Sequence, residues 1–162
     1  MTEEISLRRV LPHVFRGSEN ELPVRDSQLW LQENMTFRRG TYYLIEAESG
    51  TGKSSLCSYI YGSRHDYDGK ILFDGADARS FGIGRWCELR RRSLAYLPQE
   101  MGLFPELTVM ENIEIKNRLT AHKSGNEIVS LLERLEIGEK AGEPAGRLSV
   151  GQQQRVAIIR AL

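Results

Sequence analysis

Residues 48–55 read ESGTGKSS, and they follow an apolar run, YYLI, at residues 42–45. This order predicts a buried strand that enters a glycine-rich turn, with a helix beginning at Lys53. Glycines let backbone N–H groups converge on one anion, and a helix start adds its dipole and unpaired donors. The stretch therefore predicts a phosphate site, in which Lys53 reaches the β- and γ-phosphates and the Ser54 hydroxyl holds magnesium. The alternative is an ordinary strand–turn–helix with a solvated lysine.

One position departs from the strict pattern of Gly, four residues, then Gly-Lys-Ser/Thr. Ala47 occupies the place of the first glycine, whereas Gly52, Lys53 and Ser54 all match. The extra methyl group of Ala47 is expected to leave the loop intact.

Composition sets the class of protein. The chain has 162 residues, is 40% hydrophobic and 27% charged, and carries no net charge, as expected of a globular domain with a real core. Nothing in this balance favours broad electrostatic binding to nucleic acid or to an anionic membrane. No apolar run approaches 18 residues, and the two cysteines lack metal-ligand spacing, which predicts a reduced, cytoplasmic setting.

The remaining pattern predicts strands first and helices afterwards. Apolar runs and turn residues indicate strands at 5–10, 29–31, 35–37, 42–45, 70–73 and 93–97. Helical signals mark 53–61, 85–92, 109–119, 128–135 and a last helix from 149. Thr108 with Glu111 forms a capping box for the third of these helices, and Asn126 is the expected cap of the fourth.

A second motif, LSVGQQQR, occupies residues 148–155. Ser149 and Gln152 have the spacing of a capping box, so a helix is expected to begin here. Such a helix start is a further anion site, because its N–H groups and its positive dipole end are free. Taken alone, the motif favours a cap without any ligand.

Together the two motifs resemble the nucleotide-binding domain of ATP-binding cassette (ABC) ATPases. Residues 47–55 resemble the Walker A motif, and 148–155 match the family signature LSGGQxQR except at Val150. Between them, LPQE at 97–100 resembles the Q-loop, with Gln99 as its glutamine. The segment 99–113 is most similar to ABC ATPases that power lipoprotein release and antibiotic export. Phe15 lies near the position of the A-loop aromatic, with Val14 as its competitor by spacing.

The resemblance implies a fold class and a domain division. The class is α/β, a P-loop NTPase (RecA-like) core with antiparallel N-terminal β-strands, an inserted α-helical subdomain and an incomplete central sheet. The expected segments are 1–98, with the antiparallel strands and P-loop core, 99–148, with the Q-loop and helical subdomain, and 149–162, the signature helix, in one truncated domain.

The resemblance also implies a role for each matched residue, with ATP and Mg²⁺ as cofactors. By this resemblance Lys53 and Gln99 would be catalytic, and Ser54 and Gln99 would bind the metal. Nucleotide binding falls to Phe15, Ser49, Gly50, Thr51, Gly52, Lys53, Ser54, Ser55, Ser149, Gly151 and Gln152. Phe15 would stack on adenine, unless it is only a core residue, and Gln99 would touch magnesium or the attacking water, unless it is only a solvated loop residue.

In this family the signature faces the γ-phosphate of a second subunit, so two ATP molecules are held in a head-to-tail homodimer. The resemblance therefore implies an ATP-binding subunit that couples ATP binding and hydrolysis to transport through a transmembrane partner. That partner would dock around 99–111, on the inner face of the cell membrane.

No Walker B pair, Asp then Glu after an apolar run, follows the signature within the 162 residues. The expectation is a fragment of a longer cassette that hydrolyses ATP poorly, because phosphoryl transfer depends on metal and oriented water. Strand 42–45 is expected to lack a neighbour, which an oligomer or a rearranged sheet would cover. Val150 is expected to be strained if its position needs a positive φ, which would weaken the dimer.

Two other functions compete with this interpretation. The chain is alternatively a non-catalytic nucleotide-binding or assembly module. A P-loop kinase or small GTPase is disfavoured, because 148–155 has no role there and the guanine motif Asn-Lys-x-Asp is absent from the sequence.

Overall fold

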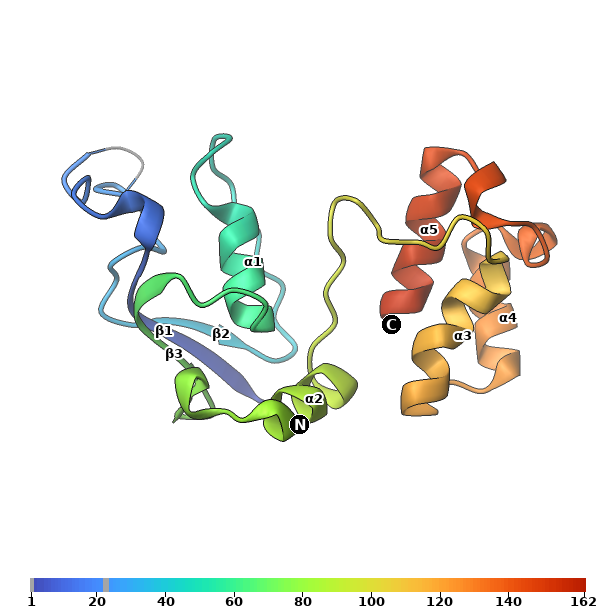
Figure 1. Cartoon of the computed structure of the whole chain (residues 1–162), viewed down its shortest axis with the longest axis horizontal. Helices are drawn as coiled ribbons and strands as arrows, with labels where there is room; N and C mark the ends of the chain where they lie inside the picture. The colour runs from blue at the N-terminus through green and yellow to red at the C-terminus, as the bar shows by residue number, and fades with distance from the viewer. Residues whose placement is uncertain (1, 22–23) are drawn as a thin grey trace. The chain divides into compact units, whose positions relative to one another are not determined.

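The computed structural model describes residues 2–21 and 24–162. The chain divides into two compact units, Met1–Leu94 and Ala95–Leu162. The first is built around a sheet and the second is helical (Figure 1). Each unit has its own hydrophobic core, so each is described by itself.

Among the described residues of the sheet unit, four strands pair antiparallel in the order β2-β1-β3-β4. Their bounds are β1 Glu4–Pro12, β2 Met35–Arg38, β3 Tyr67–Phe73 and β4 Ala76–Asp77. Leu7 of β1 pairs with Met35 on one side and with Ile71 on the other. The predicted strands at 5–10, 35–37 and 70–73 are therefore present in the structure.

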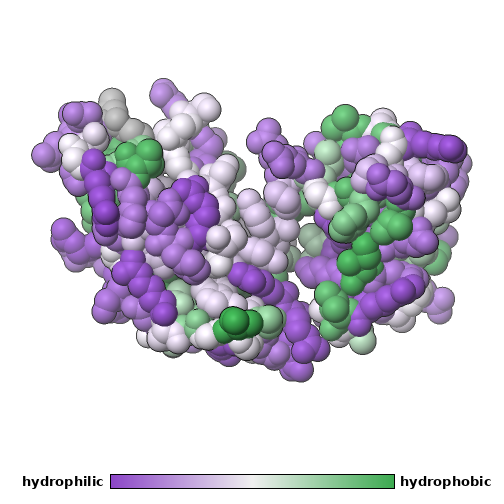
Figure 2. Space-filling view, viewed as in Figure 1, coloured by the Kyte–Doolittle hydropathy of each residue, from purple (hydrophilic) through white to green (hydrophobic). Residues whose placement is uncertain are grey.

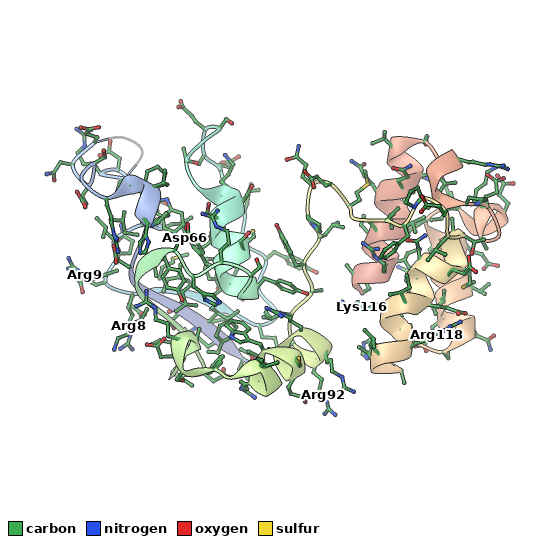
Figure 3. The ribbon with its side chains drawn as sticks, viewed as in Figure 1. Arg8, Arg9, Asp66, Arg92, Lys116 and Arg118 are labelled. Atoms are coloured by element: carbon green, nitrogen blue, oxygen red, sulfur yellow. The ribbon has the colours of Figure 1, made fainter. Side chains whose placement is uncertain are left out.

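A bulge interrupts β1 between Arg8 and Leu11, where its register against β3 shifts. Opposite the bulge, Gly69 has a φ of +81°, and a Cβ there would lie 2.3 Å from the Arg9 carbonyl oxygen. Only glycine fits this close approach. Arg8 and Arg9 themselves are exposed on the strand (Figure 3).

Two helices cover the sheet unit's core. Helix α1 (Lys53–Tyr61) buries Leu56 and Tyr59, and α2 (Ile83–Arg92) buries Trp86 and Leu89. These four side chains join one apolar cluster with buried residues of β1 and β3. The bounds of α1 match the predicted helix 53–61. Because Leu56 and Tyr59 anchor α1 in the core, packing also fixes the place where the glycine-rich turn ends.

The helical unit consists of α3 (Val109–Thr120), α4 (Gly125–Arg134) and α5 (Val150–Ala161). Short 3-10 turns lie at Gly138–Lys140 and Ala145–Arg147. Each of the three α-helices begins with a complete capping box. Their shared core contains Val109, Ile113, Ile128, Leu132, Ile137, Leu148, Val156 and Ile159.

The predicted cap of the fourth helix was wrong. Ser124 is the N-cap of α4, its hydroxyl accepts from the Glu127 N–H at 3.3 Å, and Asn126 lies inside the helix. The signal was present in the sequence as Ser-x-x-Glu at 124–127, the spacing of a capping box.

Three predicted strands are absent from the described residues. At 29–31, Leu31 makes one backbone hydrogen bond to β1 but has a φ of +59°, which breaks an extended chain. The segments 42–45 and 93–97 are irregular. A strand requires a ladder partner, and no neighbouring strand pairs with either segment in the part of the chain that the structure describes.

The segment 42–45 was expected to be buried, and it is not. Tyr42, Tyr43 and Leu44 are all exposed, and Tyr43 also contacts the edge strand β2. The Tyr43 hydroxyl accepts from the Arg38 N–H at 3.0 Å, and its ring meets Phe37 edge-on with centroids 5.1 Å apart. This side-chain contact takes the place of a strand ladder.

Apolar side chains also reach the surface of the helical unit, where they form patches in the visible face (Figure 2). The exposed apolar residues of this unit include Ile115, Leu119, Val129, Ile158 and Leu162. Within residues 2–21 and 24–162, none of the helices combines the length and the apolar character that a membrane span requires.

Candidate functional site

The loop before α1 has the backbone shape that a phosphate cradle requires. Gly50 and Gly52 have φ values of +85° and +92°, in the left-handed region that favours glycine. The Thr51 hydroxyl donates to the Glu48 carbonyl at 2.8 Å and closes the turn between them. Ala47, Ser49 and the rest of the segment up to Gly50 are exposed, so the mouth of the loop is open to a ligand.

Lys53 spans the loop. Its Nζ donates to the Glu48 carbonyl at 2.5 Å and also to the Ala47 carbonyl. The ammonium is thereby held over the loop mouth, where an incoming anion would compete with the two carbonyls. That Ala47 leaves the loop intact stays a prediction.

The start of α1 is free for an anion. Gly52 is its N-cap, and no side chain caps the helix. The first intrahelical bond runs from the Leu56 N–H to the Gly52 carbonyl, which leaves the preceding N–H groups without an intrahelical partner. Helix α2 also begins without a side-chain cap, at Gly82, whereas α3, α4 and α5 satisfy their first turns with capping boxes. An anion at α1 would do what a side chain does in those helices.

The two serines after Lys53 differ in their surroundings. Ser54 is exposed in the first turn of α1, so its hydroxyl is available to a metal. Ser55 accepts from Arg64 Nη1 at 3.2 Å. Arg64 also forms a bidentate pair with Asp66 (labelled in Figure 3), which holds the pKa of that carboxyl below its usual range.

Two aromatic side chains pack on the loop at Gly52. A Cβ at this position would lie 2.9 Å from Trp30 Cζ2 and 3.4 Å from Phe15 Cε2. Phe15 is half-buried at the end of a 3-10 turn, whereas its competitor Val14 is 76% exposed. Sequence reasoning included Trp30 only in a strand that is absent, and no spacing in the sequence links it to the loop.

Gln99 is exposed in a turn at the start of the helical unit. The backbone after it is held by Arg160 of α5, which donates to the Met101 and Gly102 carbonyls at 2.6 and 2.8 Å. Both acceptor residues have positive φ values. Lys116 of α3 (Figure 3) donates to the Ala161 carbonyl at 2.7 Å. Burial lowers the pKa of both cations, and for Lys116 the charge of Arg160 contributes as well.

A small cavity of about 110 Å³ lies beside this turn. It is lined by Glu100, Met101, Leu103, Pro105, Ala145 and Gln153. Sites for small molecules and cofactors have volumes of about 300–1,000 Å³, so this cavity is too small for a nucleotide.

The signature segment forms the predicted capping box. The Ser149 hydroxyl accepts from the Gln152 N–H at 3.3 Å, and the Gln152 side chain accepts from the Ser149 N–H at 3.0 Å. Ser149 and Gly151 are exposed. The expected strain at Val150 was wrong, because this residue is the first of α5, has no positive φ and keeps 64% of its surface exposed.

The predicted site residues thus fall into two groups. The sheet unit brings together the aromatic residue and the loop, that is Phe15, Ser49, Gly50, Thr51, Gly52, Lys53, Ser54 and Ser55. The helical unit holds the Q-loop turn and the signature, that is Gln99, Ser149, Gly151 and Gln152.

Comparison with known proteins identifies relatives of this chain. The sequence model of the family described as "ABC transporter" matches residues 32–162. The ABC transporter ATP-binding protein YtrE of Bacillus subtilis is 32% identical over 150 residues, which are 91% of this chain and 63% of YtrE. The macrolide export ATP-binding/permease protein MacB 1/2 of Paracoccus denitrificans is 34% identical over 152 residues, which are 91% of this chain and 23% of that protein.

A solved structure agrees with these relatives. The dimeric structure of MJ0796, a bacterial ABC transporter cassette, matches with a TM-score of 0.62 and 30% sequence identity. The match covers 71% of this chain and 53% of that one. The predicted fold class is confirmed by this likeness. The chain spans 63% or less of the length of YtrE, MacB and the MJ0796 cassette.

Proposed function

Because this chain belongs to the ABC transporter family, we propose that its loop 47–55 binds the phosphates of ATP. The observation that carries the proposal is the uncapped start of α1 behind two glycines of positive φ, with the Lys53 ammonium across the opening. Unpaired N–H groups, a helix dipole and one cation are the chemistry that a polyphosphate requires. Bound Mg²⁺ would neutralise phosphate charge, and the exposed Ser54 hydroxyl is its candidate ligand in this unit.

Each nearby side chain has a part in this proposal. Lys53 exchanges its bonds to two carbonyls for bonds to the β- and γ-phosphates, and Ser55 lies on the α-phosphate side. Phe15, which packs beside Gly52, offers a ring to adenine. Gln99 belongs to the helical unit, where we assign it to the metal or to the attacking water.

The signature is proposed to act on a second copy of the chain. Ser149, Gly151 and the start of α5 would face the γ-phosphate bound by the partner subunit, so that ATP joins a head-to-tail homodimer. MJ0796, named as a dimeric ABC transporter cassette, supports this assembly. Ser149 and Gly151 at the start of α5 are exposed, which supports it as well, since an interface needs accessible residues.

Replacing Val150 by glycine tests the interface. Val150 is helical and unstrained, so we expect the change to leave stability within about 0.5 kcal/mol. Removing an exposed side chain that stands where a partner's phosphate must approach is expected to increase the ATP-dependent dimer severalfold in sedimentation. The matched control is Val129→Gly, at an exposed valine of α4 away from the signature. Equal dimer fractions in Val150→Gly and the unchanged chain would contradict this role.

Transport itself is assigned to an assembly of this chain with a transmembrane partner. We propose that 99–111, which contains the Q-loop turn, faces that partner at the inner side of the membrane. MacB, named as an export ATP-binding/permease protein, supports a link between such a chain and a permease.

For the 162-residue polypeptide we propose ATP binding without sustained turnover. The 162 residues contain no adjacent Asp-Glu pair, and phosphoryl transfer depends on metal and oriented water. The test is phosphate release alongside equilibrium binding of ATP. Binding with turnover no higher in the unchanged chain than in Lys53→Ala is the expected result. Steady turnover that Lys53→Ala abolishes would contradict it, whereas no binding at all would favour the assembly module.

A further inference from the structure

Trp30 connects the sheet to the phosphate loop. Its side chain is buried, with 3% of its surface exposed, and its indole Nε1–H donates to the Thr51 carbonyl at 3.0 Å. Its six-membered ring lies against Gly52, where Cζ2 is 2.9 Å from the place of a Cβ. One side chain therefore contacts two consecutive residues of the loop, once by a hydrogen bond and once by packing.

Trp30 is itself firmly held. Its backbone N–H donates to the Ser27 hydroxyl at 2.9 Å. The next residue, Leu31, donates its N–H to the carbonyl of Val10 at 2.9 Å, and Val10 is a fully buried residue of β1. Trp30 thus links the phosphate loop, whose residues 47–50 are exposed, to the central strand β1.

The hydrogen bond fixes the direction of one peptide unit. A trans peptide is planar, so the Thr51 carbonyl and the Gly52 N–H point in opposite directions. Since the carbonyl is bound to Trp30, the Gly52 N–H points away from the indole. If the peptide rotated by half a turn, it would present a carbonyl oxygen in place of this donor, and a carbonyl repels phosphate.

We propose that Trp30 is a positioning residue of the phosphate loop, which keeps the Gly52 N–H directed toward the anion. This inference rests on the proposed function, because it concerns the same loop. It adds that the indole N–H, and not the ring area alone, prepares the loop before ATP arrives. Trp30 is also a fluorescent reporter of the loop, and Trp86 is the other tryptophan of the chain.

The test removes the indole N–H and keeps the ring. Residue 30 is replaced by 3-benzothienylalanine, whose bicyclic ring has sulfur in place of N–H, and separately by 5-fluorotryptophan, which retains the donor. Trp30→Phe is the simpler third variant. Far-UV circular dichroism confirms that each is folded. Amide exchange of 49–53 without nucleotide and the affinity for MgATP are then measured.

We expect exchange about fivefold faster and ATP affinity about fivefold weaker in the benzothienyl variant, the effect of one neutral hydrogen bond. The fluorotryptophan variant is expected to behave as the unchanged chain. Trp86→Phe serves as the matched control, because Trp86 packs against Phe73 and Phe81 with centroids 5.8 and 5.6 Å away. It is expected to keep the ATP affinity, and in this background ATP should change the emission of Trp30.

The benzothienyl variant decides the inference. Exchange and affinity equal to those of the unchanged chain would overturn the role of Trp30. If the unchanged chain does not bind ATP, the proposed function is wrong, and the exchange of 49–53 without nucleotide still decides whether the indole N–H holds the loop. Loss of affinity in the fluorotryptophan variant as well would assign the effect to packing and overturn the proposal.

Discussion

Replacement of Lys53 by alanine is expected to weaken ATP binding by roughly 30- to 100-fold. The ammonium lies across the loop mouth, where it already donates to two carbonyls. Charged hydrogen bonds contribute about 1.5–3 kcal/mol each when their partner is removed, and about 1.4 kcal/mol corresponds to tenfold in affinity. Isothermal titration with MgATP measures the change.

The matched control is Lys70→Ala, which removes an exposed lysine of β3 in the same unit. It changes the net charge equally and is expected to alter ATP affinity less than twofold. Lys53→Ala is expected to cost little stability, because the Ala47 and Glu48 carbonyls that lose the ammonium belong to exposed residues that water can reach. An equal loss of affinity in both variants would show that only overall charge matters and would contradict the role of Lys53.

The second large effect is expected at Gly52. Alanine at a left-handed position costs roughly 1–2 kcal/mol, and this applies to both Gly50 and Gly52. At Gly52 the new methyl group also meets Trp30 at 2.9 Å, and overpacking costs about 1–3 kcal/mol more. Urea unfolding should therefore show a loss of about 3 kcal/mol for Gly52→Ala and about 1 kcal/mol for Gly50→Ala.

Gly50→Ala is the control for backbone strain, since no atom lies within 4 Å of its Cβ position. Gly52→Ala is also expected to abolish measurable ATP binding, because the loop must move away from the indole. Equal stability of the two variants would mean that Trp30 does not confine the loop.

Local signals predicted the helices and the loop well. The helix at 53–61, the turn before it and the capping boxes at Thr108 and Ser149 depend on residues within a few positions of one another. The same is true of the positive φ values at Gly50 and Gly52, which the glycines themselves indicate.

The strands predicted at 42–45 and 93–97 are absent, because local signals do not decide whether a strand forms. Their apolar sequences favour extended chain, but a strand forms only when another strand supplies a ladder, and that partner is remote in sequence. For the same reason, the sequence did not predict the two long-range contacts that hold the candidate sites. Trp30 meets Thr51 across 21 positions, and Arg160 meets Gly102 across 58.

Val150 shows the limit of reasoning from a matched motif. The family glycine at this place suggested a position that needs a positive φ, whereas the structure places a helical first residue there. A glycine in a motif therefore marks either a backbone requirement or a need for open space. At Val150 the need for open space remains as the explanation, because the phosphate bound by the proposed partner subunit would approach there.

The most direct measurement of the central claim is a calorimetric titration of the chain with ATP, ADP and AMP in the presence of Mg²⁺. If loop 47–55 binds the phosphates, ATP and ADP bind and AMP is at least tenfold weaker, because AMP lacks the groups that Lys53 contacts. ATP affinity should also fall in Lys53→Ala. Equal affinities for ATP and AMP, or an ATP affinity that Lys53→Ala leaves unchanged, would contradict the account.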